Sequence, residues 1–189
     1  NKIYSYQFNE DLFKKITVVP HGKSHGLVMF IDWSGSMASH LSNTVKQLLN
    51  LVMFCKKVNI PYEVYAFANS LPDEITYNHK HKNGDLVIDG FRIVNLLSSR
   101  MTPSEFTVAG GALMAMSGSA IRFRYNMPKW FNLSGTPLNE AIIAAMEIVP
   151  HFQKMNKLQI VNTVFLTDGD GHVLCSRYSS GSYTDITGR

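Results

Sequence analysis

The sequence predicts an α/β fold in which a doubly wound, mostly parallel sheet is flanked by helices. Two observations support this class. Between residues 26 and 68, an apolar run, a segment with helical periodicity and a second apolar run follow one another. A strand–helix–strand unit of this kind forms parallel strands. Between residues 136 and 169, a second helical pattern precedes a run rich in β-branched residues, which repeats the arrangement.

The first unit begins with a buried strand at residues 27–32, an apolar run that follows a polar, turn-like stretch. The next segment has apolar residues at the i, i+4, i+7 and i+8 positions of a helix with one face on a core. These positions are Leu41, Val45, Leu48, Leu49, Val52 and Met53. Pro61 ends this helix, and YEVYAFA at residues 62–68 is predicted to be the next strand.

The middle of the chain is less regular. Residues 70–84 are predicted to form a polar loop or the tip of a hairpin, because they contain proline, asparagine and glycine. Residues 85–97 are apolar enough for one strand or two. Pro103 opens a predicted helix through Gly118, and residues 121–126 are expected to be extended.

The second helical pattern has Pro137 in its predicted first turn, where proline is favoured. Its core-facing positions are predicted to be Leu138, Ile142, Ala145, Met146 and Val149. Residues 159–169 then form a β-branched strand that ends in Thr-Asp-Gly. The tail from Gly171 is rich in Ser, Gly and Tyr, and little structure is expected there.

Composition narrows the class of protein. The 189 residues suit one domain with a substantial core, and the net charge of +4 permits an acidic partner without indicating nucleic-acid binding. No apolar run of 18 residues and no signal peptide is visible, so no membrane partner is expected. Cys55 is interpreted as a small buried hydrophobe, and with Cys175 it forms no cysteine framework. A cytoplasmic location is therefore expected.

Oxygen-bearing side chains follow these predicted elements. Asp32, Ser34 and Ser36 come after the first strand, Thr136 precedes the second core-facing helix, and Asp168 follows the later strand. Taken singly, each has a simpler explanation: a turn at Ser34–Ser36 or Asp168, or a helix N-cap at Thr136. Loops at the carboxyl ends of parallel strands converge on one crevice, however. Two carboxylates and three hydroxyls there would suit Mg²⁺, or Mn²⁺ or Ca²⁺, better than zinc or copper.

In this order, IDWSGSM, SGTPL and LTDG resemble the three loops of a von Willebrand factor A (VWA) domain, which form its metal-ion-dependent adhesion site (MIDAS). The resemblance implies a Rossmann-like VWA fold and a role for each residue. Ser34 and Ser36 would bind the metal through their hydroxyls, and Thr136 would bind it in the partner-bound state. Asp32 and Asp168 would act mostly through bound water. One coordination position would remain for an acidic side chain of a partner protein.

The resemblance also implies domain boundaries. Residues 1–26 would be an N-terminal extension packing on the domain, and residues 27–189 the VWA domain, with an insertion at about 70–130 that matches no motif. The family fold continues after Thr-Asp-Gly with another strand and helix, whereas only about 20 residues follow here. We therefore expect a C-terminally incomplete fold, as part of a longer protein, or a smaller sheet.

The function predicted on this basis is a non-enzymatic, Mg²⁺-dependent protein–protein interaction module. The chain looks more like intracellular VWA domains than like secreted adhesion ones. Intracellular relatives often work with AAA+ ATPases of the MoxR and chelatase type, and they include cobaltochelatase subunit T-like proteins, some of which bacteriophages carry. If a phage encodes this chain, the expected location is the host cytoplasm. As such a relative, the chain would be an adaptor or a non-catalytic subunit of a chelatase-like complex, since it contains no nucleotide-binding P-loop motif. The alternatives are a metal-dependent hydrolase using Asp32, Asp168 and Asp170, or an RNA-associated VWA domain.

Four further residues stand out. Trp33 is bulky for its place in the metal loop and would either pack beneath that loop or present an aromatic edge to the partner. Asp170 is interpreted as a solvated turn residue. His79 and His81 lack the neighbours that would complete a zinc site and are expected to be exposed in a loop.

Overall fold

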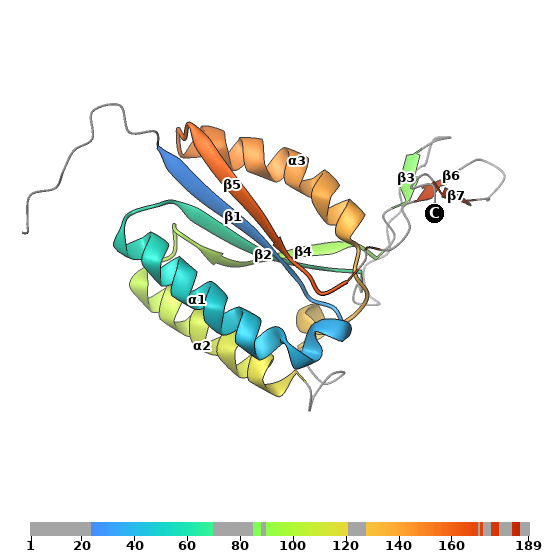
Figure 1. The fold of residues 1–189 in the computed structure, drawn as a ribbon, viewed down its shortest axis with the longest axis horizontal. Helices are drawn as coiled ribbons and strands as arrows, with labels where there is room; N and C mark the ends of the chain where they lie inside the picture. Colours follow the sequence, from blue (N-terminus) through green and yellow to red (C-terminus); the bar gives the residue numbers. More distant parts are fainter. Residues whose placement is uncertain are drawn as a thin grey trace, which may run out of the picture.

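The main sheet has four strands in the order β4-β2-β1-β5 (Figure 1). The structure is a computed structural model and describes residues 24–69, 85–87, 90–120, 128–169, 171, 175–177 and 183–185. The strands are β1 (His25–Asp32), β2 (Tyr62–Ala68), β4 (Arg92–Ser98) and β5 (Ile160–Leu166). β1 pairs in parallel with both β2 and β5, whereas β4 pairs antiparallel with β2.

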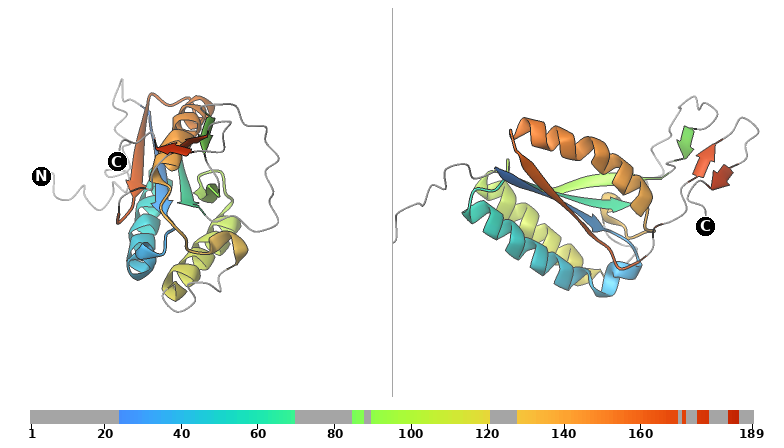
Figure 2. Two further views of the ribbon diagram at one scale, coloured as in Figure 1. Left: turned by 90° about the vertical axis from the view of Figure 1, so that its right-hand side faces the viewer. Right: turned by 45° about the horizontal axis from the view of Figure 1, so that its top comes forward.

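Helices cover both faces of this sheet. α1 (Leu41–Lys57) and α2 (Pro103–Ser119) lie side by side on one face, and α3 (Leu138–Met155) lies on the other (Figures 1 and 2). Two short 3₁₀ helices, η1 (Ser36–Ser39) and η2 (Lys129–Phe131), lie in the loops after β1 and before α3. Within the described residues, no helix has both the length and the apolar character needed to cross a membrane.

A second, three-stranded sheet is formed by β3 (Asp85–Val87), β6 (Cys175–Arg177) and β7 (Tyr183–Asp185). Its strands pair antiparallel, and Figure 1 shows it apart from the main sheet. The segment 85–97 therefore contains two strands, one in each sheet. Strands also occur beyond Gly171, so the expectation of little structure in this tail was wrong for its described residues.

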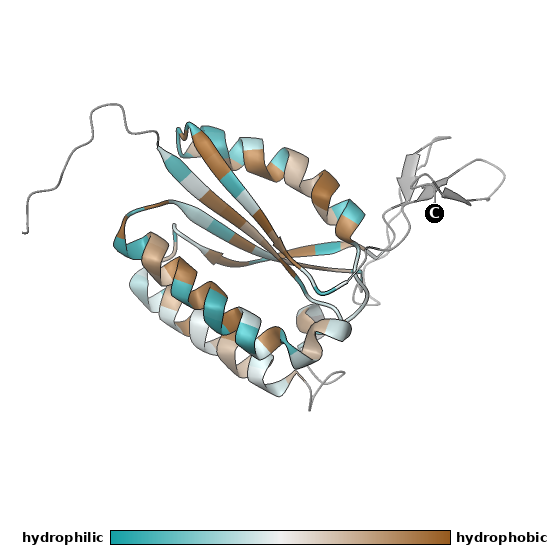
Figure 3. Cartoon of the chain, in the orientation of Figure 1, coloured by the Kyte–Doolittle hydropathy of each residue, from teal (hydrophilic) through white to brown (hydrophobic). Residues whose placement is uncertain are grey.

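The sheet separates two hydrophobic clusters because successive strand residues point to opposite faces. Met29 and Ile31 of β1 pack with the α1–α2 layer, whereas Val28 and Phe30 pack with α3. All four side chains are essentially inaccessible to solvent. The apolar run of β1 is therefore explained by a central strand that is covered on both faces, and Figure 3 shows this band of hydrophobic residues.

The predicted mostly parallel sheet is correct for its central strands, but the sheet as a whole is mixed. β4 and α2 lie within the region expected to be an insertion, yet β4 completes one edge of the main sheet and α2 packs beside α1. The predicted loop at 70–84, the predicted extended segment at 121–126 and nearly all of the predicted N-terminal extension fall outside the described residues.

The predicted buried positions of two helices need correction. Met53 of α1 is 57% exposed, and Ile142 and Met146 of α3 are 44% and 71% exposed. The prediction is confirmed for Ala145, which is buried together with Glu140, Ala141 and Phe152, while Leu138 and Val149 are partly buried. The apolar side of α3 is broad, so hydrophobic periodicity did not identify which of its apolar residues pack on the sheet.

Candidate metal centre

The predicted site lies at the carboxyl end of β1 and β5, where three loops are joined by backbone contacts. The amide of Trp33 donates to the carbonyl of Phe67, at 2.9 Å, and so connects the ends of β1 and β2. The amide of Gly35 donates to the carbonyl of Ser134, at 2.7 Å, and Ser34 and Ser134 form an isolated parallel bridge. The loop after β1 is thereby fixed against the loop that leads into α3.

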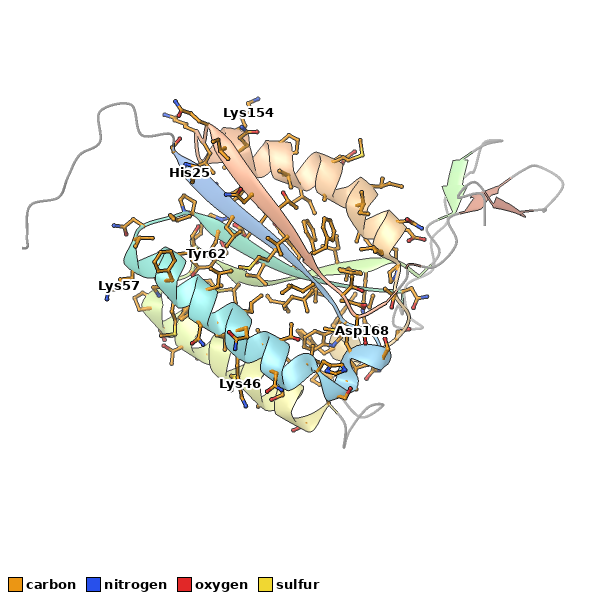
Figure 4. All side chains as sticks on the ribbon, viewed as in Figure 1. His25, Lys46, Lys57, Tyr62, Lys154 and Asp168 are labelled. Carbon is orange, nitrogen blue, oxygen red and sulfur yellow. The ribbon has the colours of Figure 1, made fainter. Side chains whose placement is uncertain are left out.

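The serine hydroxyls form a chain that ends at the second carboxylate. The Oγ atoms of Ser34 and Ser36 are 3.0 Å apart and share a hydrogen bond. Ser36 Oγ also donates to Asp168 Oδ1 at 3.0 Å. Asp168 is exposed and lies just past the end of β5, beside the turn that follows β1 (Figure 4). Residues 132 positions apart in the sequence therefore meet at this end of the sheet.

Asp32 is the buried carboxylate of the site, with no solvent-exposed surface. Its Oδ2 accepts a hydrogen bond from Thr167 Oγ1 at 2.9 Å, while its Oδ1 is buried and accepts none from the described residues. Burial raises the pKa of Asp32 above its ordinary value, and the nearby carboxylate of Asp168 raises it further. The hydroxyls of Thr167, Ser34 and Thr136 lower this pKa, because they favour the ionised form.

Thr136 completes the predicted set from the third loop. Its side chain is 7% exposed and lies near enough to Asp32 to lower the pKa of that carboxyl group. α3 begins at Leu138 with Pro137 at its N-cap position, so Thr136 lies one residue before the cap. All five predicted residues are thus assembled in one region from three separate loops.

Trp33 packs beneath the metal loop, as the first of its two predicted roles required. It is 1% exposed, and its indole Nε1 donates to the carbonyl of Phe131 at 2.7 Å. The rings of Trp33 and Phe131 meet edge to face with centroids 6.0 Å apart. Trp33 therefore supports the loop from inside and presents no edge to the surface.

Two supporting residues were not predicted from the sequence. Asn69, directly after β2, accepts through Oδ1 from Ser134 Oγ at 2.8 Å and from the amide of Gly135 at 2.9 Å. The buried Arg92 at the start of β4 donates to the carbonyl of Asn132. Both side chains hold the segment that leads to Thr136. Asn69 could have been found from its position, because it follows a strand that ends at the same edge as β1.

The donor set fits a hard divalent cation. In an octahedral Mg²⁺ shell with bonds of about 2.1 Å, adjacent ligand oxygens are separated by roughly 3 Å. The separations from Ser34 Oγ to Ser36 Oγ and from Ser36 Oγ to Asp168 Oδ1 are both 3.0 Å. Asp32 Oδ1 adds a buried acceptor that lacks a described donor. No group of three or more His, Cys, Asp or Glu residues suited to a metal occurs among the described residues, but this site has only two carboxylates and depends on hydroxyls.

The remaining polar residues noted in the sequence, His79, His81 and Asp170, lie outside the described residues. The chain matches no protein-family model, no curated protein and no solved structure. The fold and the geometry of the site are therefore the observations that bear on its function.

Proposed function

We propose that this chain is a VWA-like, Mg²⁺-dependent protein-interaction module whose MIDAS is formed by Asp32, Ser34, Ser36, Thr136 and Asp168. One observation carries the proposal. Three loops distant in the sequence place two carboxylates and three hydroxyls together, with a buried carboxylate oxygen that no described donor satisfies. An unsatisfied buried oxygen is costly, and a bound cation would offset that cost.

The position of the site supports the same proposal. Ligands of open α/β sheets bind beyond the carboxyl ends of the parallel strands, and the candidate site lies beyond the ends of β1 and β5. A doubly wound VWA fold would account for helices on both faces of the sheet and for the loops that meet here. Two strands, β2 and β1, lie between the antiparallel edge strand β4 and β5, so β4 leaves this arrangement intact.

The side chains divide into those that would hold the ion and those that position them. Ser34, Ser36 and Thr136 would provide hydroxyl oxygens, and Asp32 and Asp168 the negative charge. When bound, Mg²⁺ would supply a positive charge and a coordination position for a carboxylate of a partner protein. The partner proposed from the resemblance is an AAA+ ATPase, with this chain as its non-catalytic adaptor.

The first experiment measures metal binding by the full chain. We expect Mn²⁺, followed by electron paramagnetic resonance, to bind at one site and to be displaced by Mg²⁺. Ser34→Ala combined with Ser36→Ala should weaken Mn²⁺ binding at least a hundredfold while the circular dichroism spectrum stays unchanged. Ser39→Ala is the matched control, since Ser39 lies at the exposed end of η1 and should bind Mn²⁺ as the wild type does.

The second experiment tests the acidic partner. A short peptide with a single glutamate should bind the Mg²⁺-loaded chain, and the same peptide with glutamine should not. EDTA should abolish the binding. Unchanged Mn²⁺ affinity in the double serine variant would show that the site is wrongly assigned, and equal binding of both peptides would exclude carboxylate recognition at the metal.

A further inference from the structure

A cavity of about 500 Å³ lies between α3 and the strand β2, at the end of the sheet opposite the candidate metal centre. Its residue Glu63 is the second residue of β2, whereas the metal loop follows the last residue of the parallel strand β1. Figure 4 shows this separation, with Tyr62 and Lys154 at one end of the sheet and Asp168 at the other. The volume falls within the roughly 300–1,000 Å³ of small-molecule sites.

Glu63 lines this cavity as a buried carboxylate, 3% exposed, that is held by three side chains. Its Oε1 accepts from Ser98 Oγ at 2.8 Å and pairs with Arg100 Nη2 at 3.1 Å. Its Oε2 accepts from Asn95 Nδ2 at 2.8 Å. A carboxylate can accept about four hydrogen bonds, so Oε2 has room for a further donor from a ligand.

A β-bulge brings the donors of β4 to this one carboxylate. The register between β2 and β4 shifts after Val64, which leaves Leu96 as the extra residue of β4. Asn95 and Ser98 are three positions apart and would point to opposite faces of a regular strand. Both nevertheless donate to Glu63. Bulges of this kind redirect side chains and are frequent beside functional sites.

α3 provides the opposite wall of the cavity, which is aromatic and aliphatic. Ile148, Phe152 and Met155 line it at the i, i+4 and i+7 positions of one helix face. From the sheet, Tyr65 adds an aromatic ring, which stacks on Phe30 with centroids 5.5 Å apart. Such walls suit an apolar ligand body, and aromatic faces also attract cations.

The charges of the lining favour a cation. The lining contains two carboxylates, Glu63 and Glu147, and one guanidinium, Arg100. With the lining residue His151 counted as neutral, two negative charges and one positive charge leave a net charge of −1. The ion pair between Glu63 and Arg100 compensates one carboxylate, so the charge that a ligand would balance is that of Glu147.

We propose that this cavity binds a small molecule that combines a protonated amine with an aromatic or branched aliphatic body. The ammonium group would balance the charge of Glu147 and donate a hydrogen bond to Glu63. The body of the ligand would pack against Phe152 and Met155. Polar groups that fix the orientation of a ligand within an otherwise apolar cavity are the usual design of small-molecule sites.

This amine site goes beyond the proposed metal-dependent function and does not rest on it. None of the five residues of the candidate metal centre lines the cavity. Amine binding should therefore be the same with Mg²⁺ and with EDTA. Loss of one activity would leave the other intact, so the two proposals can fail separately.

Nuclear magnetic resonance of the full chain, with ¹³C-labelled methionine methyl groups, tests the proposal with 2-phenylethylamine as the probe. The methyl signal of Met155, identified by its loss in Met155→Leu, should shift and saturate. We expect a dissociation constant on the order of 1 mM, as suits so small a ligand. The methyl signal of Met146 should stay unchanged, because this exposed residue of α3 lies outside the lining.

Two further probes separate charge from shape. 2-Phenylethanol has a similar body without the charge, and 3-phenylpropanoate has a negative charge instead. At about pH 7 the amine is protonated, so both analogues should bind at least tenfold more weakly than the amine, since a hydrogen bond to a charged group is stronger than one between neutral groups.

Two variants assign the charge to a residue. Glu147→Gln should weaken binding of the amine at least tenfold, while the circular dichroism spectrum stays unchanged because Glu147 is an exposed helix residue. Glu147→Asp is the matched control, since it keeps the carboxylate, and it should bind the amine within about threefold of the wild type.

Three results would overturn the proposal. The first is a Met155 methyl signal that does not move up to about 20 mM amine, well above the expected dissociation constant. The second is binding of 2-phenylethanol or 3-phenylpropanoate that equals binding of the amine. The third is a Glu147→Gln variant that binds the amine as the wild type does. Any of these would mean that the network around Glu63 serves only to fasten β4 to β2.

Discussion

The candidate metal centre contains side chains that hold its loops in place as well as side chains that would bind the ion. Trp33 supports the first loop from beneath through its indole hydrogen bond to Phe131. Asn69 fixes the third loop through two hydrogen bonds, to Ser134 and Gly135. Groups that orient metal ligands typically change metal affinity by 10- to 100-fold when they are removed.

Asn69→Ala should therefore reduce both stability and metal affinity. Its two partners lose their acceptor, which costs about 1–3 kcal/mol of unfolding free energy. The loop that carries Thr136 should loosen, so that Mn²⁺ binding weakens by roughly tenfold. Urea unfolding in EDTA measures the first effect, and paramagnetic resonance of bound Mn²⁺ measures the second.

Asn156→Ala is the control for this comparison. Its amide donates to the carbonyl of Phe152 at the end of α3, at 2.9 Å, so its loss should destabilise the chain without changing Mn²⁺ affinity. If both variants weaken Mn²⁺ binding equally, Asn69 acts only through general stability.

At the scale of single residues, the sequence predicted site residues where a side chain able to bind a metal also stands next to a predicted strand or helix. Asp32, Ser34, Ser36 and Asp168 were predicted because oxygen-bearing residues follow buried strands. Asn69 and Thr167 follow strands as well, but their roles depend on which loop lies opposite, and that is set by the tertiary structure. The two roles left open for Trp33 could be distinguished only by the place of Phe131, which is 98 positions away in the sequence.

Among the elements, α2 has the most clearly defined start. Thr102 Oγ1 accepts from the amide of Glu105 at 3.3 Å, and Glu105 Oε2 accepts from the amide of Thr102 at 2.8 Å, which together form a capping box. Pro103 occupies the first turn. Hydrogen bonding to the amide and then the hydroxyl of Thr102 lowers the pKa of Glu105. This cap explains why a helix forms here in spite of its adjacent glycines.

The capping box makes part of the stability dependent on pH. Because the pKa of Glu105 is lower in the folded chain, the unfolded chain binds more protons at acidic pH. The contribution of Glu105 is therefore present at neutral pH and is lost as the pH falls through its lowered pKa. Thr102→Ala should cost about 1 kcal/mol near neutral pH, and less in acid.

Urea unfolding of the wild type, Thr102→Ala and Glu105→Gln at about pH 7 and pH 3 measures this dependence. The difference between wild type and Glu105→Gln should shrink on acidification. A difference that stays constant between the two pH values would contradict the assigned role of the carboxylate.

The extent of each helix was predictable, whereas the orientation of α3 was not. Helix periodicity and proline positions located α1, α2 and α3 to within a few residues. In α3, the residues Ala141 and Ala145 are buried while the larger Ile142 and Met146 are exposed. Small residues allow the helix to approach the sheet closely, and a pattern of hydrophobicity alone favours the larger side chains.

At the scale of the whole molecule, the sequence predicted the α/β class and the central parallel strands but not the antiparallel edge. The direction of β4 depends on the path of the chain between Ala68 and Arg92, and no local pattern specifies that path. The split of residues 85–97 between two sheets is likewise a tertiary property, because β3 finds its partner in β6, about 90 positions later.

The two carboxylates of the candidate metal centre repel each other, and a bound cation would reduce this repulsion. Asp32 is fully buried, and Asp168 lies close enough to raise its pKa. Mg²⁺ that binds only the folded chain would add about 2.7 kcal/mol of unfolding free energy at a hundredfold excess over its dissociation constant. At a fixed protein concentration, we expect the melting temperature to rise with Mg²⁺ and to fall back with EDTA.

Two variants separate the role of charge from that of coordination in this measurement. Asp32→Asn removes the buried charge, so in EDTA it should be at least as stable as the wild type, and it should gain nothing from Mg²⁺. Ser34→Ala combined with Ser36→Ala should also lose the gain from Mg²⁺, but it keeps both carboxylates and should show no increase in stability in EDTA. A wild-type chain whose melting temperature ignores Mg²⁺, or an Asp32→Asn variant that still responds to it, would mean that the buried carboxylate serves the fold alone.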